Sequence, residues 1–116
     1  MPDKTLFTRI IDGEIPGSFV HRDEHVVAIR DIHPAAPVHV LVIPRRPIPS
    51  LAALEDEDRE LMGHLMLTVK GIAEREGLAE RGYRVVINTG EEGGQTVPHL
   101  HVHILGGERL SGHGTR

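Results

Sequence analysis

Hydrophobic and polar positions along this chain follow two different periods, and the period predicts the type of each element. Apolar residues recur at helical spacing from residue 6 to 11 and again from about residue 54 to 75, which predicts two helices. Runs rich in β-branched residues over 18–21, 25–31, 38–43 and 83–89 predict four strands. A polar turn at 22–24 makes the first two of these strands a hairpin.

A fifth strand is predicted within residues 93–107, where histidine alternates with aliphatic residues. Successive side chains on a strand point to opposite sides, so three histidines share one face: His99, His101 and His103. The strands are grouped in antiparallel fashion, with two helices between the groups. We therefore expect a single α+β domain over residues 1–116, with a five-stranded antiparallel sheet, helices on one face and histidines on the other.

Several signals fix the ends of these elements. Asp3 is the predicted N-cap of the first helix, and Gly13 is its predicted stop. Gly77 is expected to end the second helix, which has acidic residues at its start. His64 lies beside the apolar stripe of that helix and is expected to be a surface or packing residue. The polar, glycine-rich tail from residue 108 is predicted to be loose.

The segment from Asp31 to Pro37 is predicted to be a fixed loop, because prolines at 34 and 37 exclude a continuous helix or central strand. A carboxylate at this position can accept hydrogen bonds from a pair of ligand hydroxyls, or it can cap its own loop. The next strand places His39, Leu41 and Ile43 on one face. His39 is thus a fourth histidine for the site.

Two kinds of chemistry fit the alternating histidines. The outer two of three on a strand are about 13 Å apart, so all three cannot bind one metal ion. Two of them with His39 could bind zinc, but the segment 93–107 carries no acidic residue to orient such ligands. Alternatively, a neutral imidazole attacks phosphorus, and the glycine-rich loop at 90–96 supplies backbone N–H groups for the phosphate.

Composition narrows the setting. The chain has no cysteine, which excludes disulfides, thiolate metal sites and thiol nucleophiles and favours the cytoplasm. It shows neither a signal peptide nor an apolar run of membrane-spanning length. A net charge of −4 and only three aromatic residues argue against a nucleic-acid surface. We expect no membrane and no nucleic-acid partner.

The stretch from Gly94 to Gly107, GQTVPHLHVHILGG, resembles the signature of the histidine triad (HIT) superfamily, specifically its Hint-like branch of purine nucleoside phosphoramidases. Five further segments are similar to that branch: LFTRIIDGEIP at 6–16, DIHP at 31–34, HVLVIP at 39–44, GHLM at 63–66 and GYRVVIN at 82–88. Three departures stand out. Thr96 replaces the usual serine, and Pro47 and Pro98 stand where the branch often has a histidine and an aromatic residue. The tail lacks a Trp-Pro-Pro-Gly type ending.

The resemblance implies the HIT-like fold and a hydrolase that cleaves nucleoside 5′-phosphoramidates of the AMP-amine type through a nucleotidyl-histidine intermediate. It implies His101 as nucleophile, His99 as its orienter through the carbonyl, and His103 and His39 as phosphate-binding and hydrogen-bonding partners. Thr96 would supply a hydroxyl for the leaving group. The implied nucleotide-binding residues are Asp31 at the ribose, Ile32, Leu6, Phe7, Ile10, Ile15 and Ile29 around the purine, and Asn88, Gly94, Gln95 and Thr96 at the phosphate.

The resemblance further implies that the reaction needs no metal or other cofactor and that the protein is a homodimer, with two sheets paired and the long helix at the interface. Three alternatives remain open at this stage. The chain could be a dinucleoside polyphosphate hydrolase with the same nucleophile, a nucleotide-binding regulatory module with weak hydrolysis, or a metal-binding protein.

Overall fold

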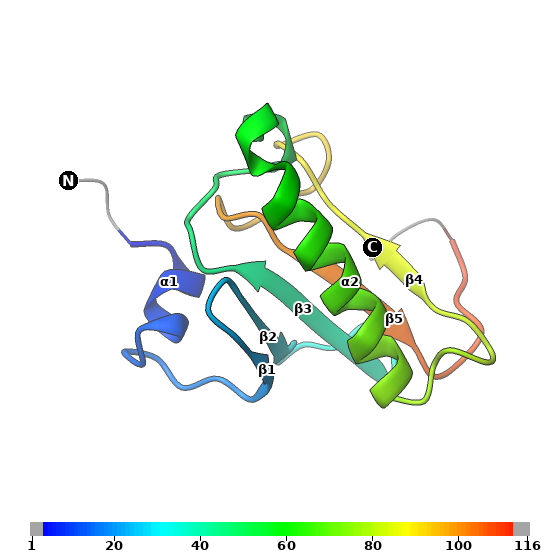
Figure 1. Cartoon of the computed structure of the whole chain (residues 1–116). Coiled ribbons are helices and arrows are strands. Elements are labelled where there is room, and N and C mark those ends of the chain that lie inside the picture. The colour runs from blue at the N-terminus through cyan, green and yellow to red at the C-terminus, as the bar shows by residue number, and fades with distance from the viewer. Residues whose placement is uncertain (1–3, 113–116) are drawn as a thin grey trace.

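The computed structural model describes residues 4–112 and confirms the predicted fold class. Five strands form one antiparallel sheet in the order β1-β2-β3-β5-β4 (Figure 1). Two short 3₁₀ turns, Leu51–Ala53 and Asp56–Asp58, precede the long helix. The bounds of the regular elements are α1 Leu6–Ile11, β1 Phe19–Arg22, β2 Val26–Arg30, β3 Val38–Pro44, α2 Arg59–Arg75, β4 Arg84–Val86 and β5 Val102–Gly106.

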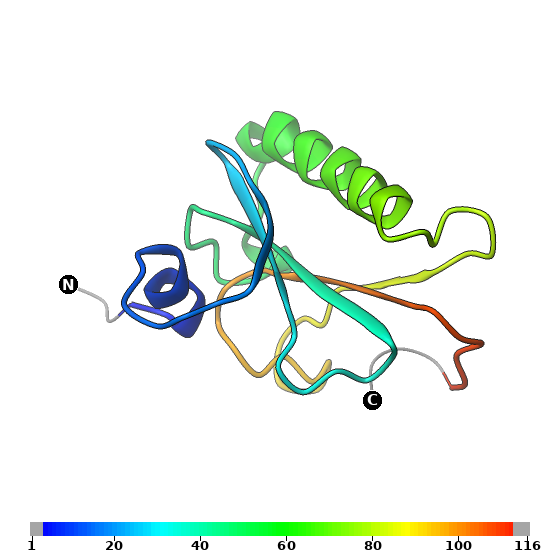
Figure 2. The same cartoon turned by 90° about the horizontal axis from the view of Figure 1, so that it is seen from below.

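The sheet is covered on both faces, which corrects the expectation that the helices share one face. Alternate residues of β2 and β3 point toward α2, whose own buried residues include Leu65, Val69 and Ile72. The intervening residues of β2 and β3 pack against Phe7 and Ile10 of α1. Figure 2 shows α2 lying along one face of the sheet and α1 beyond the other, at the β2 and β3 end. Apolar spacing identified each helix but not the side of the sheet that it covers.

The N-cap of helix α1 is Thr5. Thr5 has extended backbone geometry, and its hydroxyl accepts a hydrogen bond from the Thr8 N–H at 3.0 Å, as an N-cap residue does. The predicted cap, Asp3, lies outside the described residues. The predicted stop was accurate, because Gly13 follows the C-cap residue Asp12 and has a positive φ of 84°.

The histidine-bearing strand is shorter than predicted, since β5 begins only at Val102. The segment before it bends at residues 97–99, where the His99 N–H donates to the Val97 carbonyl at 2.8 Å. Pro98 has no N–H to donate to a neighbouring strand. His99 and His101 therefore precede the ladder. Strand β4 is correspondingly short, because its pairing with β5 ends at Val86 opposite His103.

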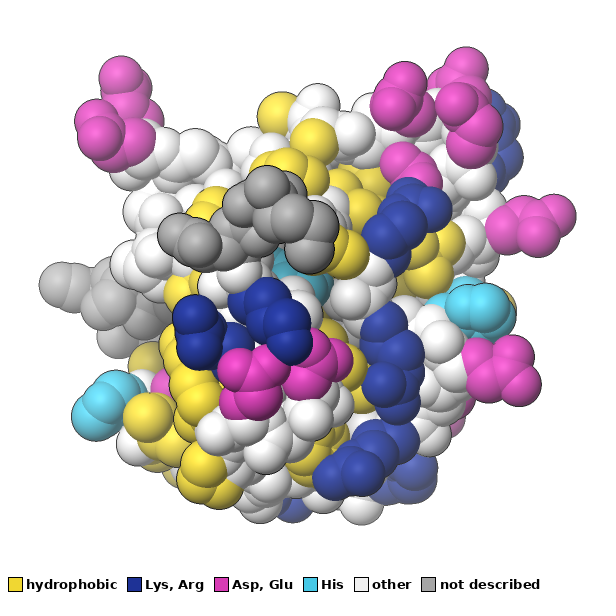
Figure 3. All heavy atoms as spheres, turned by 90° about the vertical axis from the view of Figure 1, so that its left-hand side faces the viewer, with side chains coloured by type: hydrophobic (Ala, Val, Ile, Leu, Met, Phe, Trp, Pro, Cys, Tyr) yellow, Lys and Arg dark blue, Asp and Glu magenta, His cyan; other side chains and the backbone are white. Residues whose placement is uncertain are grey.

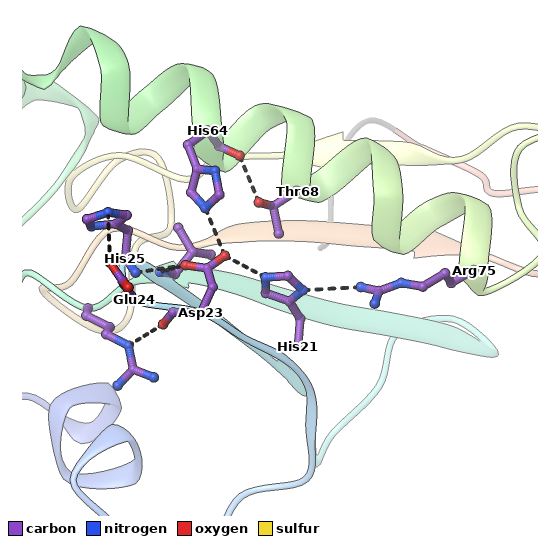
Figure 4. A network of polar contacts seen from close by, with 9 residues as sticks. His21, Asp23, Glu24, His25, His64, Thr68 and Arg75 are labelled. Carbon is purple, nitrogen blue, oxygen red and sulfur yellow. Dashed lines mark hydrogen bonds and ion pairs between the residues drawn. The ribbon is translucent and has the colours of Figure 1, made fainter.

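A carboxylate in the β1–β2 turn ties this hairpin to α2 (Figure 4). Asp23 Oδ2 accepts hydrogen bonds from His21 Nε2 at 2.7 Å and from His64 Nε2 at 2.8 Å. Its Oδ1 accepts the backbone N–H groups of His25 and Val26 at 2.7 and 2.9 Å. Partial burial raises the pKa of Asp23, but these four hydrogen bonds outweigh it and hold the pKa well below its usual value.

The end of the molecule that carries α1 shows basic side chains interspersed with acidic ones (Figure 3). Lys4 pairs with Asp12 at 2.8 Å and with Glu14 at 2.5 Å, and Arg46 pairs with Asp58. Within residues 4–112, no helix is long and apolar enough to cross a membrane.

Candidate active site

Four histidines converge on the face of the sheet that α1 covers. His39 on β3 and His103 on β5 share this face, because Leu41, two residues after His39, pairs directly with His103. The ring centroids of His39 and His103 are 5.1 Å apart, as are those of His101 and His103. The exposed fractions are 5% for His39, 0% for His99, 6% for His101 and 9% for His103. The sequence prediction of a clustered site is consistent with this placement.

The His101 ring has one nitrogen bound and one available. Its Nδ1 lies 2.7 Å from the His99 carbonyl oxygen, which can only accept, so Nδ1 carries the proton. Burial lowers the pKa of His101, although the hydrogen bond to the His99 carbonyl and the charge of Asp31 oppose the shift. The neutral ring therefore has its lone pair on Nε2. No described residue supplies a partner for that nitrogen.

The tautomers of His39 and His103 are set by one backbone amide. The Ala35 N–H donates to His39 Nδ1 at 3.0 Å, so the neutral His39 ring carries its proton on Nε2. That proton is donated to His103 Nδ1 at 2.9 Å. His103 consequently carries its own proton on Nε2. Burial, together with the nearby His101 and His39, lowers the pKa of His103 to about 4 against the opposing charge of Asp31, so the ring is neutral near pH 7.

His99 is fixed from both sides. Its Nε2 donates to the Pro44 carbonyl at 2.8 Å, and its Nδ1 lies 2.7 Å from the Thr5 hydroxyl. Burial lowers the pKa of His99, so the ring is neutral and Nδ1 accepts the Thr5 proton. Phe7 packs edge-on against both His99 and His101, with centroid distances of 5.9 and 4.8 Å. Helix α1 thus contacts the first two histidines of the motif.

Asp31 fills one of the two roles that the sequence left open, the capping of its own loop. Its Oδ1 accepts the His33 N–H at 2.8 Å, which caps the loop, while Oδ2 lies 3.6 Å from His39 Nε2 at the edge of the site. Donor atoms of Asp31, His39 and His103 all lie within 4.8 Å of one another, a carboxylate and two imidazoles that could hold a transition metal. The His39 Nε2 proton already forms a hydrogen bond to His103 Nδ1, and a cation bound by both nitrogens would have to displace that proton.

The glycine-rich loop is held by side chains that the sequence placed at the phosphate. Gln95 accepts the Gly90 N–H at 2.9 Å and donates to the carbonyls of Pro49 and Val97. Asn88 Nδ2 donates to the Gly93 carbonyl at 2.8 Å. These amide groups order the loop, so a phosphate there would have to use its backbone. Thr96 is exposed at the end of the loop.

The residues predicted around the purine fall into two groups. Phe7, Ile10 and Ile29 are at most 9% exposed and belong to a core cluster against which Ile15 packs. Leu6 and Ile32 are 46% and 86% exposed, so their side chains are available to a ligand.

Sequence reasoning missed the groups that orient the histidines. They are the Ala35 N–H, the Pro44 carbonyl and the Thr5 hydroxyl. Thr5 could have been recognised as a helix N-cap from its residue type and its place before Leu6. Its contact with a residue 94 positions later has no local signal, and backbone donors and acceptors carry none at all.

Taken together, the site places an unprotonated nitrogen, His101 Nε2, beside a ring whose Nε2 carries a proton, His103. The first can attack an electrophilic centre and the second can donate to an anionic oxygen. Both rings are largely removed from water, where such interactions are stronger than at an exposed surface.

Comparison with known proteins gives consistent matches over nearly the whole chain. The HIT domain family matches residues 12–110. A purine nucleoside phosphoramidase of Escherichia coli is 44% identical over 110 residues, covering 95% of this chain and 92% of that protein. An uncharacterised HIT-like protein of Synechococcus elongatus is 55% identical over 111 residues, or 96% of each chain. The crystal structure of a HIT family hydrolase from Legionella pneumophila superposes with a TM-score of 0.91 at 42% identity, covering 93% of this chain and 96% of that one.

Proposed function

Because this chain belongs to the HIT family of hydrolases, we propose that it cleaves nucleoside 5′-phosphoramidates of the AMP-amine type through a covalent nucleotidyl-histidine. The observation that carries the proposal is the state of His101, with its Nδ1 proton held by the His99 carbonyl and its Nε2 free. The relative from Escherichia coli, a purine nucleoside phosphoramidase by name, supports the choice of bond.

In the first step, the Nε2 lone pair of His101 attacks the α-phosphorus and the P–N bond to the amine breaks. The amine leaves with a proton, for which the Thr96 hydroxyl is the proposed donor or relay. Positive charge develops on the His101 ring, and the bond from Nδ1 to the His99 carbonyl stabilises it. In the second step, water attacks phosphorus and the P–N bond to His101 breaks, which restores the neutral ring. The proton that the water loses returns through the Thr96 hydroxyl, and the nucleoside monophosphate is released.

The other groups bind the substrate in this proposal. His103 donates its Nε2 proton to a phosphoryl oxygen, and His39 fixes the tautomer of His103. Asn88, Gly94, Gln95 and Thr96 form the phosphate loop, in which Gln95 acts by ordering backbone N–H groups. Asp31 Oδ2 accepts from the ribose hydroxyls. Leu6 and Ile32 contact the purine, and the apolar residues packed beneath them are Phe7, Ile10, Ile15 and Ile29.

Two copies of the chain form the active protein in this proposal. Strand β4 is an edge of the sheet; Val85 on it is 41% exposed, and Tyr83 just before it is 37% exposed. Helix α2 exposes Met66 and Leu67 at 41% and 70%. Pairing two β4 edges would join the sheets and cover these side chains. Neither nucleic acid nor a membrane is a proposed partner.

The decisive assay compares adenosine 5′-phosphoramidate with a diadenosine polyphosphate, each with and without a chelator. The proposal expects faster turnover of the phosphoramidate and no effect of the chelator. Preferred cleavage of the polyphosphate would assign the chain to dinucleoside polyphosphate hydrolysis instead. Tight AMP binding without turnover of either compound would identify a nucleotide-binding module, and loss of activity on chelation would favour a metal enzyme.

The nucleophile is tested by His101→Ala. This variant should still bind AMP, because the phosphate and ribose contacts remain, while the barrier to cleavage rises by up to about 8 kcal/mol. Mass spectrometry of the unmodified protein, quenched without acid during turnover, should find the nucleotidyl group on His101. Near-native turnover by His101→Ala would refute the mechanism.

A further inference from the structure

The contact between α1 and the histidine cluster points to a role for a residue outside the histidine motif. The Thr5 hydroxyl accepts the Thr8 N–H at 3.0 Å and donates to His99 Nδ1 at 2.7 Å, which is its shortest hydrogen bond. The Thr8 hydroxyl lies 3.1 Å from it and 3.5 Å from the same ring nitrogen. One side chain therefore both starts the helix and holds the first histidine.

The direction of the bond to His99 follows from the other end of the ring. The Pro44 carbonyl can only accept, so the proton of the neutral His99 ring is on Nε2 and Nδ1 has a lone pair. His99 is fully buried, so an unsatisfied ring nitrogen there would be destabilising. The single proton of the Thr5 hydroxyl satisfies it.

Fixing His99 also fixes the nucleophile proposed above. The His99 carbonyl accepts the Nδ1 proton of His101 at 2.7 Å, and Phe7, two residues after Thr5, packs edge-on against both rings. The ring of His99 is held at both nitrogens by buried hydrogen bonds, which restrict movement of the residue that carries this carbonyl. A displaced carbonyl would turn the His101 ring away from the line of attack.

We propose that Thr5 is a positioning residue for catalysis: its hydroxyl fixes the tautomer and position of His99, and through the His99 carbonyl it aims His101. This role rests on the proposed function. Thr5 touches neither substrate nor the reacting atoms, so it acts on the turnover rate and not on ground-state binding. Because Thr5 is also the N-cap, formation of α1 and alignment of the nucleophile are coupled.

Three substitutions separate donation from capping. Thr5→Ser keeps both functions. Thr5→Val keeps the shape and loses both. Thr5→Asp caps a helix as well as threonine does, but its carboxylate can only accept, so His99 must place a proton on Nδ1. Nitrogen-15 NMR of the imidazole rings reports which nitrogens are protonated, and steady-state kinetics reports kcat and KM.

We expect Thr5→Ser to match the unmodified protein in His99 spectra and to stay within about twofold in kcat. Thr5→Val should lose about tenfold or more in kcat with KM nearly unchanged, and Thr5→Asp should show a protonated His99 Nδ1 and a lowered kcat despite its intact cap. If His99 Nδ1 stays unprotonated in Thr5→Asp, or if kcat of Thr5→Asp equals that of Thr5→Ser, the proposal is wrong.

The two proposals can fail separately. The NMR comparison needs no substrate, so it tests the contact between Thr5 and His99 even if the unmodified protein cleaves no phosphoramidate. If Thr5→Val does not fold, the pair Thr5→Ser and Thr5→Asp still gives both readouts.

Discussion

At the scale of single residues, the four histidines differ in the group that sets each protonation state. Sequence alone presents His99, His101 and His103 as three similar side chains on one strand. In the structure, His101 donates from Nδ1 to the His99 carbonyl, and the His99 ring is hydrogen-bonded at both nitrogens. His103 accepts a hydrogen bond at Nδ1 from His39. The asymmetry comes from backbone groups that the sequence pattern does not display.

The pH dependence of turnover should report the state of His101. Burial lowers the pKa of this ring, and only the neutral ring has the Nε2 lone pair, so activity is present above its pKa and lost as the pH falls through it. We expect kcat/KM to stay constant from pH 8 down to below 6.5, the ordinary histidine value, and to decline only at more acidic pH. Steady-state rates of phosphoramidate cleavage measure this.

A blank without enzyme is required at each pH, since P–N bonds also hydrolyse in acid. A half-maximal rate at pH 6.5 or above would contradict the prediction, because it would mean that burial does not keep the nucleophile neutral.

At the scale of elements, periodicity predicted the type and order of both α-helices and all five strands, but it missed the two 3₁₀ turns and failed where tertiary contacts decide. The stripes of α1 and α2 show that each helix buries one face, yet both faces of β2 are buried, so apolar spacing cannot assign a side. The start of β5 depends on Pro98 and on the Leu100 N–H, which donates to the Ile48 carbonyl at 2.7 Å. The alternation of histidine and aliphatic residues over 99–103 predicted that the whole segment pairs as a strand, but pairing begins only at Val102.

The Asp23 contacts should stabilise the attachment of the hairpin to α2. Asp23→Asn removes the negative charge of the side chain that accepts hydrogen bonds from His21 and His64. We expect the free energy of unfolding to fall by about 1–2 kcal/mol at pH 7, a modest loss because the site is partly exposed. Because the folded pKa of Asp23 is depressed, its contribution is present at neutral pH and lost as the pH falls through the folded value. Urea unfolding measures both effects.

Glu24→Gln is the matched control, because its side chain lies in the same turn and is 93% exposed. A loss in Asp23→Asn no larger than that in the control would show that the network contributes nothing to stability.

At the scale of the whole molecule, the sheet is shielded on its faces but open along β4. Val85 pairs with Ile104, which faces α2, so its side chain points to the same side as that helix. Its partial exposure there, beside an unpaired strand edge, is the basis for the proposed dimer. The sequence suggested the dimer only through family resemblance, since one chain cannot show which apolar surface a second copy covers.

Val85→Glu should separate the proposed dimer, because two carboxylates would face each other across the paired edges. Sedimentation velocity at micromolar concentration should show a dimer for the unmodified chain and a monomer for this variant. Leu51→Glu is the control, since Leu51 is equally apolar, 46% exposed and outside β4. A monomeric unmodified chain, or a Val85→Glu variant that sediments as the dimer, would contradict the proposal.

The use of backbone groups to set the histidine tautomers has a practical consequence for redesign. The carbonyls of Pro44 and His99 are present whatever side chains occupy these positions, and the amide at position 35 is present with any residue except proline. A library that randomises Leu6 and Ile32, the exposed residues proposed to contact the purine, therefore leaves the tautomers of the four histidines unchanged. Substrate range can be changed at these two positions without rebuilding the cluster, provided that Thr5, the N-cap of α1 that donates to His99, is kept as threonine or serine.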